Sequence, residues 1–248
     1  TGLRAVPLLI AILNLTLLKR GCIALHASAF DYGDTGVLVT GWAKSGKTEA
    51  LLAFAAHGAK YVGDEWVILT KDGETMYGLP EPMTVWDWHI NQLPRIRDQL
   101  TITKSLAFKT IHLAGRLQNY FGNGRLKNTL PMRLMADVLP ALNRQLYIKV
   151  PVEKIFKGNS IELISKPEKL FLIMSQEQPG ISVETWSPAD IARRMLESIY
   201  YEQVPFFEYF NAFKFAFPEA RNEFLENVRI LQSDILTSAL RDKEAYRV

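Results

Sequence analysis

The chain has 248 residues, of which 48% are apolar and 22% charged, and its formal net charge at pH 7 is +3. These values exclude a disordered chain and fit one large domain or a domain with an insertion. The charge is too small to indicate nucleic acid by itself, and the single Cys22 excludes an internal disulfide and a cysteine metal cage.

The most apolar segment, Ala5–Leu18, predicts a buried helix that ends at Gly21. A membrane helix needs about 20 apolar residues, whereas this segment is shorter and contains Pro7 and Asn14. A signal peptide is the alternative, although no clear cleavage site follows. We therefore expect no membrane span, and the lone cysteine suits a cytoplasmic protein.

The first third of the chain alternates short apolar runs with glycine-containing turns. This pattern predicts a helix at Thr48–His57, closed by Gly58, and strands at Cys22–Phe30, Val37–Thr40, Tyr61–Thr70 and Glu74–Leu79. We interpret residues 21–81 as a nucleotide-binding core.

Residues 82–144 interrupt this alternation and predict an inserted, basic helical subdomain. Candidate helices lie at Trp86–Gln99, Lys104–Phe121 and Met132–Leu142. Between Arg95 and Lys149, ten basic residues stand against two acidic ones, which predicts either a solvated face or a surface for an anionic partner. Aromatic and basic residues do not interleave there, so the pattern disfavours nucleic acid.

Residues 145–248 return to strands and end in helices. The strands are predicted at Gln145–Val152, Ile161–Ile164 and Lys169–Met174, and Ser187 caps a long helical region with breaks near Pro205 and Pro218. Seven aromatic residues within Phe206–Phe217 favour a core or a subunit interface, so a homo-oligomer stays open. A membrane-surface patch is the alternative for this segment. The predicted fold is one α/β domain over residues 1–248, with a mixed β-sheet core and an inserted helical subdomain.

One segment carries a phosphate-binding pattern. Gly41-Trp-Ala-Lys-Ser-Gly46-Lys47-Thr48 matches G-x-x-x-x-G-K-[ST] between an apolar strand and a helix. Glycines let the N–H groups face inward as an anion nest, and the helix points its positive dipole end at the same place. Lys47 would contact the β- and γ-phosphates of ATP, and the Thr48 hydroxyl would ligate Mg²⁺. A glycine turn that matches by chance is the alternative. The candidate nucleotide-binding residues are Gly41, Trp42, Ala43, Lys44, Ser45, Gly46, Lys47, Thr48 and Glu49.

Asp64 and Glu65 are adjacent acids in an otherwise apolar strand. Burying two acids is costly unless a cation meets them, and Mg²⁺ bound at the loop would supply one. The candidate metal ligands are Thr48, Asp64 and Glu65. Because neighbours in a strand point to opposite faces, one acid would hold the metal and the other would take a proton from an attacking hydroxyl. For Glu65, a solvent-facing position on an edge strand is the alternative.

Residues Gly21–Leu69 resemble the catalytic core of the HPr kinase/phosphorylase family, whose more distant relatives include ATP-dependent phosphoenolpyruvate carboxykinase. Lys47, Gly58 and Asp64 fall on the family's order of strand, phosphate loop, helix ending in glycine, and acid-bearing strand. "LHASAF" (Leu25–Phe30) resembles its histidine-bearing strand. The resemblance implies a P-loop kinase core that uses ATP and Mg²⁺.

The resemblance also implies roles for two residues. Asp64 would be the general base and His26 a helper near the γ-phosphate; a histidine packed between strands is the alternative for His26. Lys47 is the third candidate catalytic residue, because its ammonium would neutralise charge on the phosphoryl oxygens. The family has Ser-Gly where this chain has Ala43-Lys44, and its second acid is Asp instead of Glu65. These departures, and the lack of the family's later glycine-rich signature, argue against phosphorylase activity and against HPr as the substrate.

These features predict an ATP- and Mg²⁺-dependent kinase that transfers the γ-phosphoryl group to a hydroxyl, with serine of a protein or peptide as the favoured acceptor. Two alternatives stay open. A nucleotide-binding sensor or assembly subunit without transfer activity is favoured by the altered loop and Glu65. A kinase of a small phosphorylated metabolite is suggested by the basic insertion.

Overall fold

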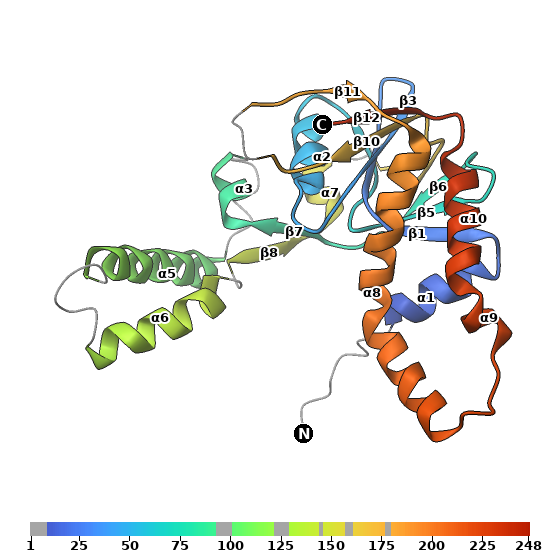
Figure 1. Ribbon diagram of the computed structural model, residues 1–248. Helices are drawn as coiled ribbons and strands as arrows, with labels where there is room; N and C mark the ends of the chain where they lie inside the picture. The colour runs from blue at the N-terminus through green and yellow to red at the C-terminus, as the bar shows by residue number, and fades with distance from the viewer. Residues whose placement is uncertain (1–8, 93–100, 122–128, 144–145, 157–160, 177–179) are drawn as a thin grey trace. The chain divides into compact units, whose positions relative to one another are not determined.

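The computed structural model describes residues 9–92, 101–121, 129–143, 146–156, 161–176 and 180–248. The chain is α/β, and its largest sheet is mixed (Figure 1), as predicted. It divides into two compact units, Thr1–Pro80 with Phe156–Val248, and Glu81–Ile155. The second unit is therefore inserted in the first, and it extends beyond the expected insertion at 82–144.

The first unit contains most of the strands and the candidate site. Its strands are β1 (Cys22–His26), β2 (Ser28–Tyr32), β3 (Thr35–Gly41), β4 (Lys60–Gly63), β5 (Trp66–Thr70), β6 (Met76–Gly78), β9 (Ile164–Ser165), β10 (Lys169–Ile173), β11 (Glu184–Thr185) and β12 (Glu244–Arg247). Its helices are α1 (Leu9–Leu18), α2 (Lys47–Ala56), α8 (Pro188–Ala216), α9 (Glu223–Glu226) and α10 (Val228–Leu240).

The larger sheet has the strand order β11-β12-β10-β3-β2-β4, and the smaller one β1-β5-β6-β9. In the larger sheet β3 is parallel to β10, whereas β2 is antiparallel to both β3 and β4. The strands β3 and β4 therefore run in the same direction and end at the same edge, where β2 begins. This arrangement brings the segment after β3, the segment after β4 and Ser28 together.

Two segments predicted as single strands each pass from one sheet to the other. Cys22–Phe30 is divided at Ala27 into β1 and β2, and Tyr61–Thr70 is divided at Asp64-Glu65 into β4 and β5. The two crossings are joined by a hydrogen bond of 3.2 Å from the Ala27 N–H to the Glu65 carbonyl. The predictions of continuous strands were wrong because each half pairs in a different sheet. Asp64 and Glu65 consequently lie in a bend and do not occupy opposite faces of one strand.

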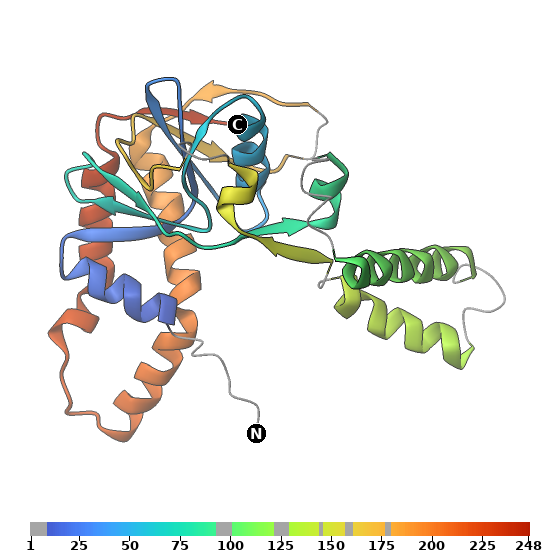
Figure 2. The same cartoon turned by 180° about the vertical axis from the view of Figure 1, so that it is seen from behind.

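The helices of the first unit pack on the two sheets (Figures 1 and 2). Helix α2 contacts β2, β3 and β4, whereas α1, α8 and α10 contact one another and also β1. One apolar core joins both sheets with α1, α8 and α10, and it includes Leu25, Leu38, Leu170, Ile191 and Leu236, each at most 1% exposed. The six-stranded sheet therefore rests on the same core as α8, the helix that borders the candidate site.

Helix α8 differs from its prediction at one point. Its start is as expected, since Ser187 caps it by accepting a hydrogen bond from the Asp190 N–H, and it ends before Pro218. The expected break near Pro205 was wrong, because the helix continues through this residue to Ala216. Phe206 and Phe207 pack against the core, and this burial offsets the hydrogen bond that proline cannot donate.

Helix α1 confirms the prediction of a helix over its described residues. Leu15 and Leu18 are buried, whereas Leu9 and Ile12 on the other side are exposed. None of the helices in the described part of the chain combines the length and the apolar character that crossing a bilayer requires.

The second unit is a two-stranded sheet with helices inserted between its two strands and one short helix after them. It contains β7 (Met83–Trp86), α3 (Asp87–Gln92), α5 (Ile102–Phe121), α6 (Leu130–Asn143), β8 (Tyr147–Val150) and α7 (Val152–Ile155). Strand β8 pairs with β7, antiparallel, and not with the larger sheet. The helix predicted over Trp86–Gln99 begins one residue later, at Asp87, because Trp86 belongs to β7. Its last part and the predicted loop at 122–124 lie outside the described residues.

Candidate functional site

The segment between β3 and α2 forms a compact loop. The Ser45 N–H donates a hydrogen bond to the Trp42 carbonyl at 3.1 Å, and Gly46 caps α2 with a φ of 105°. Position 41 requires glycine because neighbouring atoms approach its backbone closely. A Cβ there would lie 2.4 Å from Ser45 Oγ and 2.6 Å from the Ile173 carbonyl oxygen. The first N–H groups of α2 have no acceptor within the helix and point toward this loop, the arrangement that binds phosphate in other proteins.

Lys44 occupies the position at which the resemblance led us to expect glycine. Its φ is 65°, in the left-handed region that glycine adopts without strain and that costs other residues about 1–2 kcal/mol. The loop has therefore taken this backbone conformation without the glycine. Trp42, Ala43 and Glu49 are exposed around it, so the nest of backbone N–H groups is open to solvent.

Lys47 lies underneath the loop and is only 6% exposed. Its Nζ donates hydrogen bonds to the carbonyl oxygens of Gly41 at 3.2 Å and of Trp42 at 2.9 Å. Burial lowers the pKa of Lys47, while the nearby carboxylates of Glu65 and Asp64 act in the opposite direction. An ammonium held by two neutral carbonyls can exchange them for the stronger charge-assisted bonds that phosphate oxygens offer.

Asp64 follows β4 directly and meets two hydroxyl groups. Ser28 donates a hydrogen bond to Asp64 Oδ1 at 2.5 Å, and Thr48 Oγ1 lies 3.3 Å from Oδ1 and 3.2 Å from Oδ2. The Asp64 residue is 3% exposed, so its carboxylate is held in place within the protein. The structure thus brings together Thr48 and Asp64, which are two of the three candidate metal ligands.

The surroundings of Asp64 change its acidity. Burial raises the pKa of Asp64 to about 6, and the negative charge of Glu65 adds to this effect. The hydrogen bonds from Ser28 and Thr48 lower the pKa but do not cancel the cost of burial. A carboxylate with a pKa near neutrality accepts a proton from a hydroxyl more readily than an ordinary aspartate does.

This shift predicts a pH dependence of stability. The folded-state pKa of about 6 lies above the ordinary value of 3.8, so folding favours the protonated acid. Asp64 therefore stabilises the nucleotide-free protein below pH 4, and this contribution is lost as the pH rises through 6. We expect Asp64→Asn to gain stability relative to the wild type between pH 4 and 7.5, by about 3 kcal/mol.

Urea unfolding of both proteins at a series of pH values would measure this difference. Asp34→Asn, in the exposed turn between β2 and β3, is the matched control and should leave the pH dependence unchanged. Parallel pH profiles for wild type and Asp64→Asn would contradict the shifted pKa.

The Glu65 side chain contacts a histidine, and it is not directed to the two hydroxyl groups that contact Asp64. Its φ is 66°, and its Oε2 lies 3.0 Å from His26 Nε2. On the other side of the ring, Glu202 Oε1 of α8 lies 3.4 Å from His26 Nδ1, an ion-pair distance without the alignment of a directed hydrogen bond. Burial disfavours protonation of His26, but Glu202 and Glu65 together outweigh it and raise its pKa.

Two of these neighbours were not predicted from the sequence. Ser28 had a weak local signal, since it is a polar residue inside an apolar strand pattern. Glu202 had none, because it lies far along the chain in a helix whose position over His26 depends on tertiary packing. Tyr201, beside Glu202, places its ring centroid 5.3 Å from that of Trp42 and so brings α8 to the loop as well.

The side chains at this edge fit a magnesium ion that is shared with a nucleotide. Mg²⁺ usually takes one or two carboxylates or hydroxyls from the protein, and phosphates and water supply its other ligands. Thr48 and the buried Asp64 carboxylate provide such a pair, whereas Glu65 is directed to His26. In the described part of the chain, no cluster of three or more His, Cys, Asp and Glu side chains is arranged to hold a metal by itself.

Comparison with models of known protein families found no match, and a search among curated proteins found no significant match. The functional interpretation of this chain therefore depends on the geometry of the site and on the sequence pattern that it contains.

Proposed function

We propose that the protein is an ATP- and Mg²⁺-dependent kinase that transfers the γ-phosphoryl group to a hydroxyl, with serine of a protein or peptide as the favoured acceptor. One observation carries this proposal. The phosphate loop with its buried Lys47 and the hydrogen-bonded pair Thr48–Asp64 lie at one edge of the sheet, at the ends of β3 and β4. Phosphoryl transfer needs these parts together: an anion nest, a cation, and a carboxylate with a hydroxyl.

In this proposal each residue has a defined task. The loop N–H groups and Lys47 bind the phosphates and stabilise the charge that spreads over the transferred group. Mg²⁺, when bound, would bridge the phosphates and neutralise part of their charge. Asp64, fixed by Ser28 and Thr48, orients the acceptor hydroxyl and takes its proton. His26, whose pKa is raised by Glu202 and Glu65, assists near the transferred phosphoryl group.

Glu202 acts through His26 in this scheme and is a positioning residue. We expect Glu202→Ala to lower kcat by about 10-fold, because an ion pair of this kind is worth about 1–2 kcal/mol. Glu202→Gln should restore part of the rate, since it keeps the shape of the side chain and turns the negative end of an amide dipole to the ring. In a His26→Ala background, Glu202→Ala should cost nothing further.

Transfer from ATP is measured for the single and double variants, with Glu208→Ala of the same helix as the matched control, since Glu208 is exposed. A loss that is additive to that of His26→Ala would show that Glu202 does not act through the histidine.

The proposed function is tested by incubating the protein with γ-labelled ATP and a cell extract. Label on a macromolecule is the expected result. Label on a small compound would identify a metabolite kinase. ATP binding without any labelled product would favour the second candidate, a nucleotide-dependent sensor or assembly subunit. That candidate is supported by the contact of Glu65 with His26, which directs this acid away from Thr48.

We place the protein in the cytoplasm, where its unpaired Cys22 would stay reduced.

A further inference from the structure

A hollow of about 460 Å³ lies in the first unit between the phosphate loop, the end of β10 and α8. Its walls include Trp42 and Ala43 of the loop, Ile173 and Met174 at the end of β10, and Met195 and Ser198 of α8. The backbone N–H groups of Trp42 and Ala43 belong to the proposed phosphate-binding loop, but none of the side chains that line the hollow has a task in the proposed transfer step. The hollow is therefore a feature that the phosphate-binding parts do not account for.

The hollow borders the part of the loop at which the γ-phosphate is expected. In loops of this type the lysine reaches the β- and γ-phosphates. Here the Lys47 ammonium lies against the carbonyls of Gly41 and Trp42, in the first half of the loop, and not at its α2 end. Trp42 and Ala43 line the hollow. A group seated there would therefore lie near the transferred phosphoryl group and far from the α-phosphate and nucleoside.

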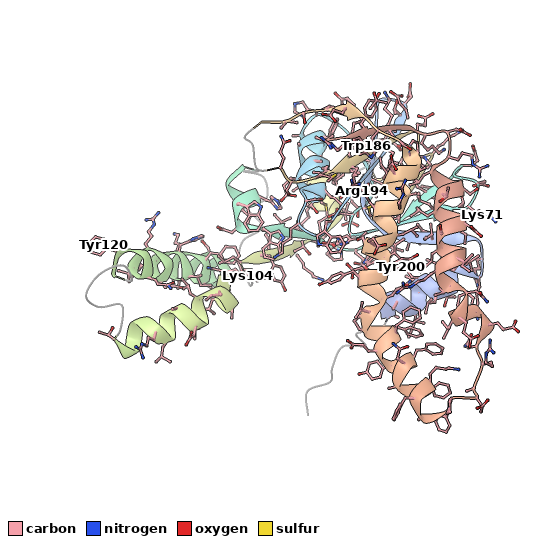
Figure 3. The ribbon with its side chains drawn as sticks, viewed as in Figure 1. Lys71, Lys104, Tyr120, Trp186, Arg194 and Tyr200 are labelled. Atoms are coloured by element: carbon pink, nitrogen blue, oxygen red, sulfur yellow. The ribbon has the colours of Figure 1, made fainter. Side chains whose placement is uncertain are left out.

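The chemistry of the walls favours an apolar occupant. Met174 is 37% exposed and Met195 is 2% exposed, and methionine adapts its shape to varied apolar groups. The Trp42 side chain, 52% exposed, adds an aromatic ring to the lining and packs against the ring of Tyr201. The charged lining residues are Arg194 (Figure 3) and Glu197, one of each sign. This balance does not suit a small phosphorylated metabolite, which would require an excess of cations.

We propose that this hollow is an acceptor subsite, which seats an apolar or aromatic side chain next to the acceptor serine or threonine of a peptide segment. The inference rests on the proposed kinase function and narrows its substrate class. A peptide with an acidic or basic residue at that flanking position would have to bury a charge among Met174, Met195 and Trp42, and is disfavoured for that reason.

The test uses a peptide library in which a single serine is flanked by variable positions, together with γ-labelled ATP. At one flanking position we expect Phe, Leu and Met to exceed Asp and Lys by about 10-fold or more in kcat/KM. Met174→Glu, at a half-exposed position, should abolish this preference and raise the relative rate with Lys. Its ATP affinity should stay within about twofold of the wild type, as should that of the control Val183→Glu, which adds the same charge at an exposed apolar residue outside the hollow.

Each contrary outcome has a separate meaning. Equal use of all flanking residues, or an unchanged preference in Met174→Glu, would overturn the subsite and leave the kinase proposal standing. A loss of ATP affinity in Met174→Glu but not in Val183→Glu would overturn the acceptor subsite, because it would show that the nucleobase of ATP occupies the hollow. Phosphorylation of no library member would also overturn the subsite, and the kinase proposal would fall with it only if the cell extract were unlabelled as well.

Discussion

Lys47→Met is expected to lower kcat/KM for phosphoryl transfer from ATP by about 10²- to 10³-fold, the usual cost of removing one donor that stabilises charge in a transition state. Methionine keeps the bulk of the buried lysine stem but lacks its ammonium. The variant would also leave the carbonyls of Gly41 and Trp42 without their donor. Thermal unfolding should therefore accompany the kinetic measurement, to show that the fold is retained.

The control for this variant is Lys71→Met, in the exposed turn after β5 (Figure 3). It removes the same charge from the same unit and should leave transfer unchanged. If Lys47→Met were folded and transferred phosphate at the rate of the wild type, the loop around it would not be the phosphate-binding site.

Asp64→Asn is expected to lower kcat by about 10²- to 10⁴-fold, the range for loss of a general base, while ATP affinity changes only a few-fold. Asparagine still accepts the hydrogen bonds of Ser28 and Thr48, so the bend between β4 and β5 should persist. The rate loss would then report the missing proton acceptor and not a collapsed site.

Magnesium dependence separates the two tasks that Asp64 could perform. If Asp64 served only to hold the ion, raising the Mg²⁺ concentration should restore the rate of Asp64→Asn. If it takes the proton, saturating Mg²⁺ should leave the rate low. Asp34→Asn, the exposed control, should behave as the wild type does. Retained transfer in Asp64→Asn at ordinary Mg²⁺ concentrations would rule out the base assignment.

The parts of the site that follow one another in the chain were predictable from the sequence. The loop, α2 and the residue after β4 lie within a short segment whose glycines and apolar runs determine local structure. Gly58, with a φ of 89° just after α2, has the conformation expected of a helix C-terminal cap. The backbone conformation of Lys44 could not be predicted in this way, since tertiary structure holds this residue at a positive φ that lysine disfavours.

The strand crossings could not be read from hydrophobic patterns. An apolar run of β-strand type indicates that the segment is buried, but it does not indicate which sheet each half of the segment joins. At Ala27 and at Asp64-Glu65 the chain leaves one sheet for the other, and this exchange creates the bend in which the acids lie. The strand pattern predicted opposite faces for the two acids, whereas the structure directs Asp64 to Thr48 and Glu65 to His26.

Contacts between segments that lie far apart in the chain could not be predicted from local sequence patterns either. Glu202 reaches His26 because α8 packs on the core shared by both sheets, and α8 itself continues through Pro205, where the sequence predicted a break. The C-terminal strand β12 was missed for the same reason, since its few residues become a strand only by pairing with β10 and β11.

The most direct test of this account is a crystal structure of the protein with Mg²⁺ and a non-hydrolysable ATP analogue. We expect the phosphates in the loop between Gly41 and Thr48, with Lys47 Nζ moved from the carbonyls of Gly41 and Trp42 to the terminal phosphate and Asp64 beside Thr48 at the ion. An empty loop in the presence of saturating analogue, with Lys47 still bonded to those carbonyls, would contradict the account.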